Sequence, residues 1–137
     1  MIPLSSVLLV DDDSTNNFLN ELLLKNLNVT DRVLVAEDGT QALSLLEQLD
    51  APDEPALILL DVNMPGLNGI GFLEAYRQLP SARHKAVVVV LTTTMDARDL
   101  ARLDELNIAG LVSKPLTEEK VESLLLLHFQ RQLPAAH

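Results

Sequence analysis

The chain contains no cysteine and no tryptophan, and only 3% of its residues are aromatic. The absence of cysteine excludes disulfides, thiolate zinc sites, iron–sulfur clusters and cysteine nucleophiles. With so few aromatic rings, the sequence offers no stacking platform for bases or sugars. The hydrophobic core is therefore expected to be aliphatic.

Basic residues and long apolar runs are also scarce. Twenty Asp and Glu residues against ten Lys and Arg give a formal net charge of −10, which repels the phosphate backbone of nucleic acids. The longest unbroken apolar run, residues 86–91, is far shorter than a membrane span, and no basic region precedes the first apolar residues. We expect a soluble cytoplasmic protein that binds neither nucleic acid directly nor a membrane.

The size and composition are those of one globular domain. The chain has 137 residues, of which 47% are hydrophobic and 22% are charged. We expect a single domain over residues 1–133, followed by a short C-terminal tail at residues 134–137. Such a tail leaves no room for an output domain, so a stand-alone module is expected.

Short apolar runs recur along the chain, separated by stretches in which apolar residues have helical spacing. Runs such as 57–60 and 87–91 do not alternate with polar residues, as expected for parallel strands covered on both faces. The predicted strands are 6–10, 32–36, 56–60, 87–91 and 110–112. The predicted helices are 14–27, 39–49, 69–78, 96–106 and 117–131. The pattern predicts an α/β fold of five βα units, with a doubly wound parallel five-stranded sheet.

Polar residues with complementary chemistry follow the predicted strands. In a doubly wound fold the ligand site lies beyond the carboxyl ends of the strands. Asp11 and Asp12 follow the first strand, Asp61 the third, Thr92 the fourth and Lys114 the fifth. Three carboxylates at one edge repel one another, and Mg²⁺ with oxygen ligands relieves that repulsion. A lysine and a hydroxyl on the opposite side would complete a frame for a phosphoryl group.

Asp61 is the best candidate for a nucleophile. A carboxylate can attack phosphorus and form an aspartyl phosphate. The predicted strand of Asp61 is central in the sheet, between the acidic pair and the threonine and lysine side. The other two aspartates would then hold the metal.

The sequence resembles the receiver domain of two-component response regulators, of the stand-alone type, over nearly the whole chain. The matching segments are 7–13, 57–69, Thr92 after a valine run, and the Lys114-Pro115 pair. The resemblance implies a flavodoxin-like (βα)₅ fold with strand order 2-1-3-4-5. It also implies a signalling domain that catalyses only its own phosphorylation and dephosphorylation.

The resemblance further implies roles for individual residues. Asp61 would accept a phosphoryl group from a histidine kinase or phosphotransfer protein. Mg²⁺ (or Mn²⁺) would be bound directly by Asp12, Asp61 and the backbone carbonyl of Asn63, and by Asp11 through water. Thr92 and Lys114 would contact the phosphoryl oxygens.

The same resemblance implies a cis peptide between Lys114 and Pro115 and a conformational switch. Thr92 would move toward the phosphoryl group and shift the loop 93–98 and the following helix between two arrangements. The downstream protein partner is not identified by the sequence.

Some positions differ from the family pattern, and others are expected to adjust the lifetime of the aspartyl phosphate. Leu111 stands where many members carry an aromatic residue whose rotation reports phosphorylation. Thr93 replaces the Ala or Ser that is common after the switch hydroxyl, and its bulk narrows the entrance. Asn63 and Thr94 flank the same entrance and are expected to tune the lifetime of the aspartyl phosphate.

Three alternatives use a similar fold or site. A phosphatase of the haloacid-dehalogenase type would need a second acid two residues after Asp61, where this chain has Asn63. A flavin-binding module would need Ser, Thr and Gly donors in the first loop, which is acidic here. A scaffold that works without phosphorylation remains open because of Leu111.

The last predicted helix has a wide apolar arc. Val121, Leu124 and Leu125 form one stripe for the sheet. A second apolar set lies about a third of a turn away and consists of Leu126, Phe129 and Leu133. The second set indicates either packing at the sheet edge or a partner surface. We expect a monomer or weak homodimer whose mass changes with the phosphoryl mimic beryllofluoride if that surface is used.

Overall fold

A computed structural model describes residues 3–50, 53–62, 68–79, 86–93, 97–106 and 108–131, without the side chains of 97–99. Asn63, Thr94, Leu133 and the expected tail at 134–137 lie outside the described residues. The expectations for these positions therefore stay predictions.

Five strands alternate with five helices along the described chain. The strands are β1 (Val7–Val10), β2 (Val33–Ala36), β3 (Leu57–Asp61), β4 (Val87–Thr92) and β5 (Gly110–Ser113). The helices are α1 (Ser14–Asn26), α2 (Gly39–Gln48), α3 (Gly69–Arg77), α4 (Ala97–Glu105) and α5 (Glu118–Phe129). All strand pairs are parallel, and the sheet order is β2-β1-β3-β4-β5. The predicted fold class and strand order are confirmed.

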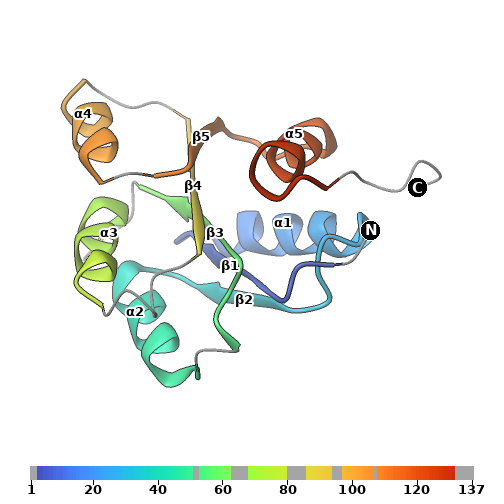
Figure 1. The fold of residues 1–137 in the computed structure, drawn as a ribbon, viewed down its shortest axis with the longest axis horizontal. Coiled ribbons are helices and arrows are strands. Elements are labelled where there is room, and N and C mark those ends of the chain that lie inside the picture. The colour runs from blue at the N-terminus through green and yellow to red at the C-terminus, as the bar shows by residue number, and fades with distance from the viewer. Residues whose placement is uncertain are drawn as a thin grey trace.

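The sheet is covered on both faces, which explains the unbroken apolar runs in the central strands. Figure 1 shows α2, α3 and α4 along one side of the sheet and α1 and α5 along the other. Every residue of β1 and β3 is buried. Two aliphatic cores follow, one under α2, α3 and α4 and the other under α1 and α5. Phe72 and Tyr76, which stack with ring centroids 5.6 Å apart, are the aromatic members of the first core.

Side-chain caps fix where four of the helices begin. Asp13, Asp38, Asn68 and Thr117 each accept a hydrogen bond from a backbone N–H in the first turn of the following helix. Because these caps come soon after strand ends, each helix turns back over the sheet directly. The carboxyl edge of the sheet is left to short loops that carry the polar residues. None of the helices described here has the length and apolarity that a membrane crossing requires.

Candidate functional site

Three carboxylates meet at the carboxyl edge of the sheet. Asp11 follows β1 and Asp61 ends β3, and these strands pair in register with Val10 opposite Leu60. One carboxylate oxygen each from Asp11, Asp12 and Asp61 lies within 4.8 Å of the others. Asp11 and Asp61 are buried, whereas Asp12 is exposed. The expected convergence of the acidic residues is thus present.

The backbone around Asp11 is held by three hydrogen bonds. Its N–H donates to the carbonyl of Ala36 at 3.1 Å, and its Oδ1 accepts from the N–H of Asp13 at 2.9 Å. The Asn17 side-chain amide donates to the Asp11 carbonyl at 2.8 Å. Sequence reasoning missed Asn17. The available signal was its position seven residues before Leu24, which places both on the sheet-facing side of α1.

Lys114 supplies the positive charge in the cluster. Its Nζ lies 3.0 Å from Asp11 Oδ2 and 3.5 Å from Asp61 Oδ2. Its backbone N–H donates to the Thr92 carbonyl at 2.8 Å, so β4 and β5 stay joined beyond their last pair. We expected this lysine on the side opposite the acids, yet its side chain reaches across and pairs with two of them. Buried carboxylates require such a countercharge.

The surroundings of Lys114 act on its ionisation in opposite directions. Burial by itself lowers the pKa of the ammonium, but the hydrogen bond and charge of Asp11, together with Asp61, outweigh it. The pKa of Lys114 is therefore raised above its ordinary value. The residue keeps its positive charge throughout the neutral pH range.

The other predicted residues in the described part of the chain lie around the same edge, except Leu111, which lies earlier on β5. Thr92 is buried at the end of β4, and Thr93 is exposed beside it. The peptide bond between Lys114 and Pro115 is cis. Leu111 lies on β5 with 46% of its surface exposed, so the position of the family's aromatic residue faces solvent in part.

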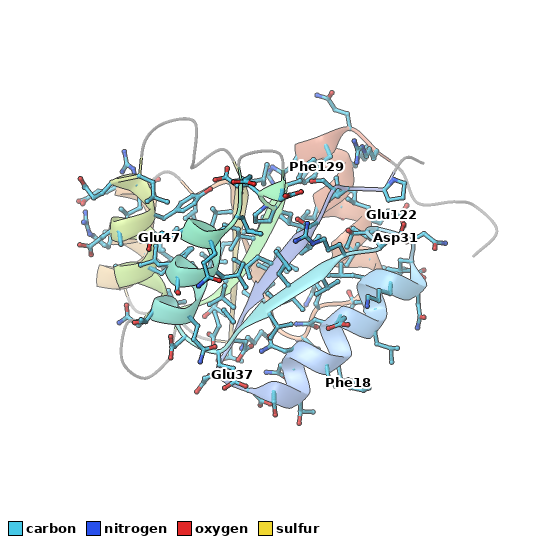
Figure 2. The ribbon with its side chains drawn as sticks, turned by 90° about the horizontal axis from the view of Figure 1, so that it is seen from below. Phe18, Asp31, Glu37, Glu47, Glu122 and Phe129 are labelled. Carbon is cyan, nitrogen blue, oxygen red and sulfur yellow. The ribbon has the colours of Figure 1, made fainter. Side chains whose placement is uncertain are left out.

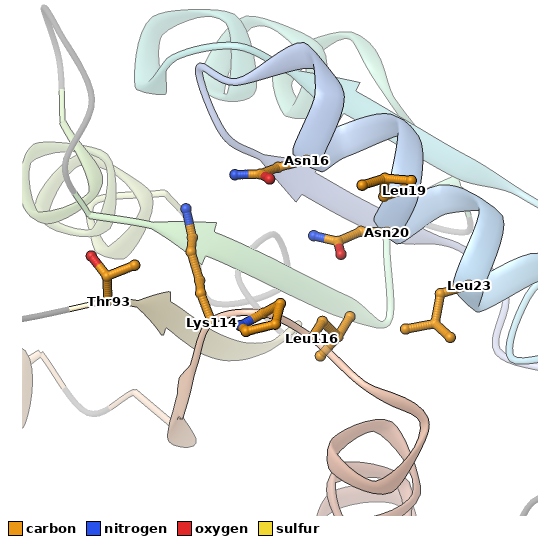
Figure 3. A pocket seen from close by; sticks show the side chains of 8 residues that line it. Asn16, Leu19, Asn20, Leu23, Thr93, Lys114 and Leu116 are labelled. Atoms are coloured by element: carbon orange, nitrogen blue, oxygen red, sulfur yellow. The ribbon is translucent and has the colours of Figure 1, made fainter.

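A pocket of about 490 Å³ opens next to Lys114. Figure 3 shows Asn16, Leu19, Asn20 and Leu23 of α1 along one side of it, with Thr93, Lys114 and Leu116 along the other. Beyond the pocket, α1 presents apolar side chains to solvent, and Phe18 projects from its outer face (Figure 2). Apart from Lys114, the residues that line this pocket are uncharged.

Gly69, the first residue of α3, packs against the strand that carries Asp61. A Cβ at this position would lie 2.7 Å from both the Asp61 carbonyl oxygen and the Val62 Cα. The Gly69 N–H also donates to the Val62 carbonyl at 3.2 Å. Sequence reasoning treated this glycine only as part of a turn. The structure adds that its missing side chain lets α3 approach the end of β3.

The donor set fits a hard divalent cation. Carboxylate oxygens are the ligands that Mg²⁺ prefers, and the three groups are close enough to share one ion. The buried pair of aspartates would carry uncompensated charge without Lys114 or a cation. The arrangement can hold a cation, a phosphoryl group and a carboxylate nucleophile together.

Comparisons with known proteins agree with this arrangement. The family model for the response regulator receiver domain matches residues 7–126. The probable chemotaxis protein CheY of Rhizobium etli is 32% identical over 119 residues, which cover 87% of this chain and 88% of that protein. The transcriptional regulatory protein CpxR of Escherichia coli K12 is 38% identical over 120 residues, covering 86% of this chain and 46% of that protein. The chain thus spans about half the length of that relative.

A solved structure gives the same result for the fold. The two-component response regulator from Cytophaga hutchinsonii superposes with a TM-score of 0.82 at 30% sequence identity. The aligned part covers 94% of this chain and 99% of that one. From the family match over residues 7–126 and these likenesses in sequence and fold, we conclude that the chain belongs to the response regulator receiver domain family of two-component signalling.

Proposed function

We propose that this chain receives a phosphoryl group on Asp61 from a histidine kinase or phosphotransfer protein and signals the change to a protein partner. The observation that carries the proposal is the contact of one ammonium, Lys114 Nζ, with both Asp11 and Asp61 inside a cluster of three carboxylates. That arrangement provides a nucleophile, a cation site and a fixed positive charge in one place.

The proposed reaction is a direct transfer. A carboxylate oxygen of Asp61 forms a bond to phosphorus while the P–N bond of the donor phosphohistidine breaks. The imidazole leaves with the bonding electrons and takes a proton from solvent. In the later dephosphorylation, a water oxygen forms a bond to phosphorus and releases a proton to solvent, while the bond between phosphorus and the Asp61 oxygen breaks. Inorganic phosphate departs, and the bonding electrons restore the Asp61 carboxylate.

Lys114 and Thr92 would stabilise the transferred group. A protonated lysine offers positive charge to the equatorial oxygens, on which charge develops during transfer. The raised pKa of Lys114 keeps that charge in place. The Thr92 hydroxyl, at the end of the neighbouring strand, would donate to a phosphoryl oxygen.

Asp11, Asp12 and Asp61 would hold Mg²⁺ or Mn²⁺, together with the backbone carbonyl of Asn63. The bound ion would neutralise charge shared between the carboxylates and the phosphoryl oxygens. The two buried aspartates fix the ligand positions, and exposed Asp12 leaves the site open to solvent.

The signal would travel through the end of β4. The Thr92 carbonyl accepts a hydrogen bond from the Lys114 N–H. A movement of Thr92 toward the phosphoryl group would therefore act on both β4 and β5. Thr93 and Thr94 would follow, and α4 would shift with them. Because Leu111 replaces an aromatic residue, we propose that this shift does not depend on ring rotation.

The domain limits and the location in the cell belong to the same proposal. We place the receiver domain at residues 1–133 with a tail at 134–137, as a cytoplasmic monomer or weak homodimer. Membership of the receiver family disfavours the phosphatase and flavin alternatives. A phosphorylation-independent scaffold is the alternative that the experiment must decide.

Intact mass spectrometry after incubation with acetyl phosphate and Mg²⁺ tests the function. We expect one phosphoryl adduct on the wild-type chain and none on Asp61→Asn or in the metal-free control. A folded wild-type protein that never gains an adduct would support the scaffold and overturn the proposal. An adduct that persists in Asp61→Asn would move the acceptor to another residue.

A further inference from the structure

Lys120 occupies a position where helix formation does not favour a lysine. It is the third residue of α5, and its backbone N–H donates to the Thr117 cap at 3.3 Å. In a capping box this position carries Glu or Gln, whose side chain turns back to the cap. A cation here also lies at the positive end of the helix dipole. Glu118 and Glu119 in the same turn follow the usual preference, so Lys120 is the exception.

The Lys120 side chain makes three contacts outside its helix. Its Nζ donates to the Ser113 carbonyl at 2.8 Å, to Ser113 Oγ at 3.2 Å and to the Pro115 carbonyl at 3.0 Å. Three donors are the full capacity of an ammonium group. The two residues that accept these bonds stand on either side of Lys114.

Lys114 is thereby fixed from two directions. Its backbone N–H is bonded to Thr92, and its ammonium contacts Asp11 and Asp61. The carbonyls on both sides of it are held by Lys120. One ammonium therefore holds the backbone from which the other reaches into the acidic cluster.

We propose that Lys120 is a positioning residue for the phosphorylation of Asp61. By clamping residues 113–115 it sets where the Lys114 ammonium stands when the phosphoryl group arrives. The inference rests on the proposed function and assigns this chain a specific element of that site.

The clamp is expected to act on the reaction more than on folding. Its bonds are solvent-exposed, so removing the ammonium leaves no buried polar group unpaired, which limits the cost to stability. The carbonyls that it releases can bond water instead. Transfer rates, in contrast, depend steeply on the placement of charged groups around the phosphorus.

The test compares Lys120→Met with Lys25→Met, which removes another exposed lysine with a single ion pair, to Glu21, on α1. Phosphorylation by acetyl phosphate and Mg²⁺ is followed by intact mass over time. We expect Lys120→Met to be phosphorylated about tenfold more slowly, the size of effect that follows from a small displacement of a reacting group. Lys25→Met should match the wild type. Equal rates for Lys120→Met and the wild type would overturn the inference.

A double-mutant cycle separates positioning from general stabilisation. If Lys120 acts through Lys114, then adding Lys120→Met to Lys114→Met should leave the residual rate nearly unchanged. The same tenfold loss in both backgrounds would show that Lys120 acts independently of Lys114 and would overturn the inference. Circular dichroism checks that each variant folds, and Lys120→Gln replaces Lys120→Met in the comparison if the latter does not.

The wild-type time course distinguishes a failure of the proposed function from a failure of the role proposed for Lys120. A wild-type chain that gains no adduct overturns the proposed function and this inference with it. A phosphorylated wild type with an unaffected Lys120→Met variant leaves the proposed function standing and removes Lys120 from it.

Discussion

Asp12 and Asp13 are adjacent in sequence, but they meet different electrostatic surroundings. Asp12 belongs to the cluster whose carboxylate oxygens lie within 4.8 Å of one another. Asp13 caps α1, where its Oδ1 accepts from the N–H of Thr15 at 2.9 Å and of Asn16 at 3.2 Å. One carboxylate faces like charges, and the other faces the positive end of a helix.

The same substitution at these two positions should therefore change stability in opposite directions. In the presence of a chelator, Asp12→Ala should raise the unfolding temperature by a few degrees, because it removes like-charge repulsion. Asp13→Ala should lower it by about 4 °C, since losing a helix cap costs about 1 kcal/mol. Thermal unfolding followed by circular dichroism measures both. A decrease of similar size in the two variants would contradict the assignment of Asp12 to a repulsive cluster.

Tyr76 gives a second test at the scale of one residue, because it is the single tyrosine in a chain without tryptophan. Burial raises the pKa of its phenol, although the bond from the Ala86 N–H to its oxygen opposes the shift. Folding thus favours the protonated phenol. Its contribution to stability is complete below the ordinary pKa of about 10 and is lost as pH rises through the higher pKa of the folded state.

Ultraviolet absorbance of tyrosinate reads this group without interference from other residues. We expect the native protein to titrate above the pKa that the chain shows in denaturant. Unfolding midpoints in urea should fall as pH rises through the same interval, and less steeply in Tyr76→Phe. Identical titration curves for the native and denatured chains would contradict the burial of the phenol.

At the scale of elements, the approach of α3 to β3 depends on Gly69. A Cβ there would stand 2.7 Å from backbone atoms of Asp61 and Val62, neither of which can rotate away. Gly69→Ala should therefore displace the end of β3 and lower stability by about 1–3 kcal/mol. Asp61 would move with it, so phosphorylation should slow as well.

Gly110→Ala is the matched control, because the nearest atoms that its Cβ would meet belong to side chains: His128 Nε2 at 3.4 Å and Val89 Cγ2 at 4.0 Å. Denaturant unfolding and the phosphorylation time course should both separate the two variants. If Gly69→Ala unfolds at the same denaturant concentration as Gly110→Ala, the close approach of α3 to β3 is not a constraint.

The elements themselves were largely predictable from the sequence. Strands buried on both faces leave unbroken apolar runs, and caps such as Asp13 and Asn68 mark helix starts locally. The ends differ by one or two residues where geometry decides. Residues 130 and 131 fall outside α5, for example, because Gln130 takes a left-handed conformation with φ of 54°.

The acidic cluster was also predictable, because parallel strands bring their carboxyl ends to one edge. The contacts of Lys120 and Asn17 were not. Each depends on how a side chain in the first turn or turns of a helix folds back over the residues just before that helix. A lysine on the polar face of a helix is expected to be solvated, so the sequence alone does not indicate that Lys120 binds backbone carbonyls.

On the surface of α5 the second apolar set divides between the two expected environments. Phe129 packs against the core beneath α1 and α5, whereas Leu126 and Leu127 are 51% and 74% exposed. The apolar arc of α5 is thus wider than its buried face. Leu127, which was not singled out, is more exposed than any other large hydrophobic residue described.

At the scale of the whole molecule, the net charge of −10 and the cluster around Asp61 both favour the binding of cations, but in different ways. Screening of a dispersed charge depends on ionic strength and does not saturate at low concentrations. Binding at one site saturates and adds stability that grows with the logarithm of the ion concentration. The two effects can be separated by comparing salts at matched ionic strength.

We expect NaCl to raise the unfolding temperature gradually and MgCl₂ to raise it further. At a Mg²⁺ concentration one hundred times the dissociation constant, binding should add about 2.7 kcal/mol to the free energy of unfolding. In Asp12→Ala the additional Mg²⁺ effect should disappear, while the NaCl effect stays, because one charge in a net of −10 changes little of the general repulsion. Thermal unfolding across both salt series measures this. If the two wild-type curves coincide at equal ionic strength, the three carboxylates bind no specific cation, and Lys114 alone neutralises the buried pair.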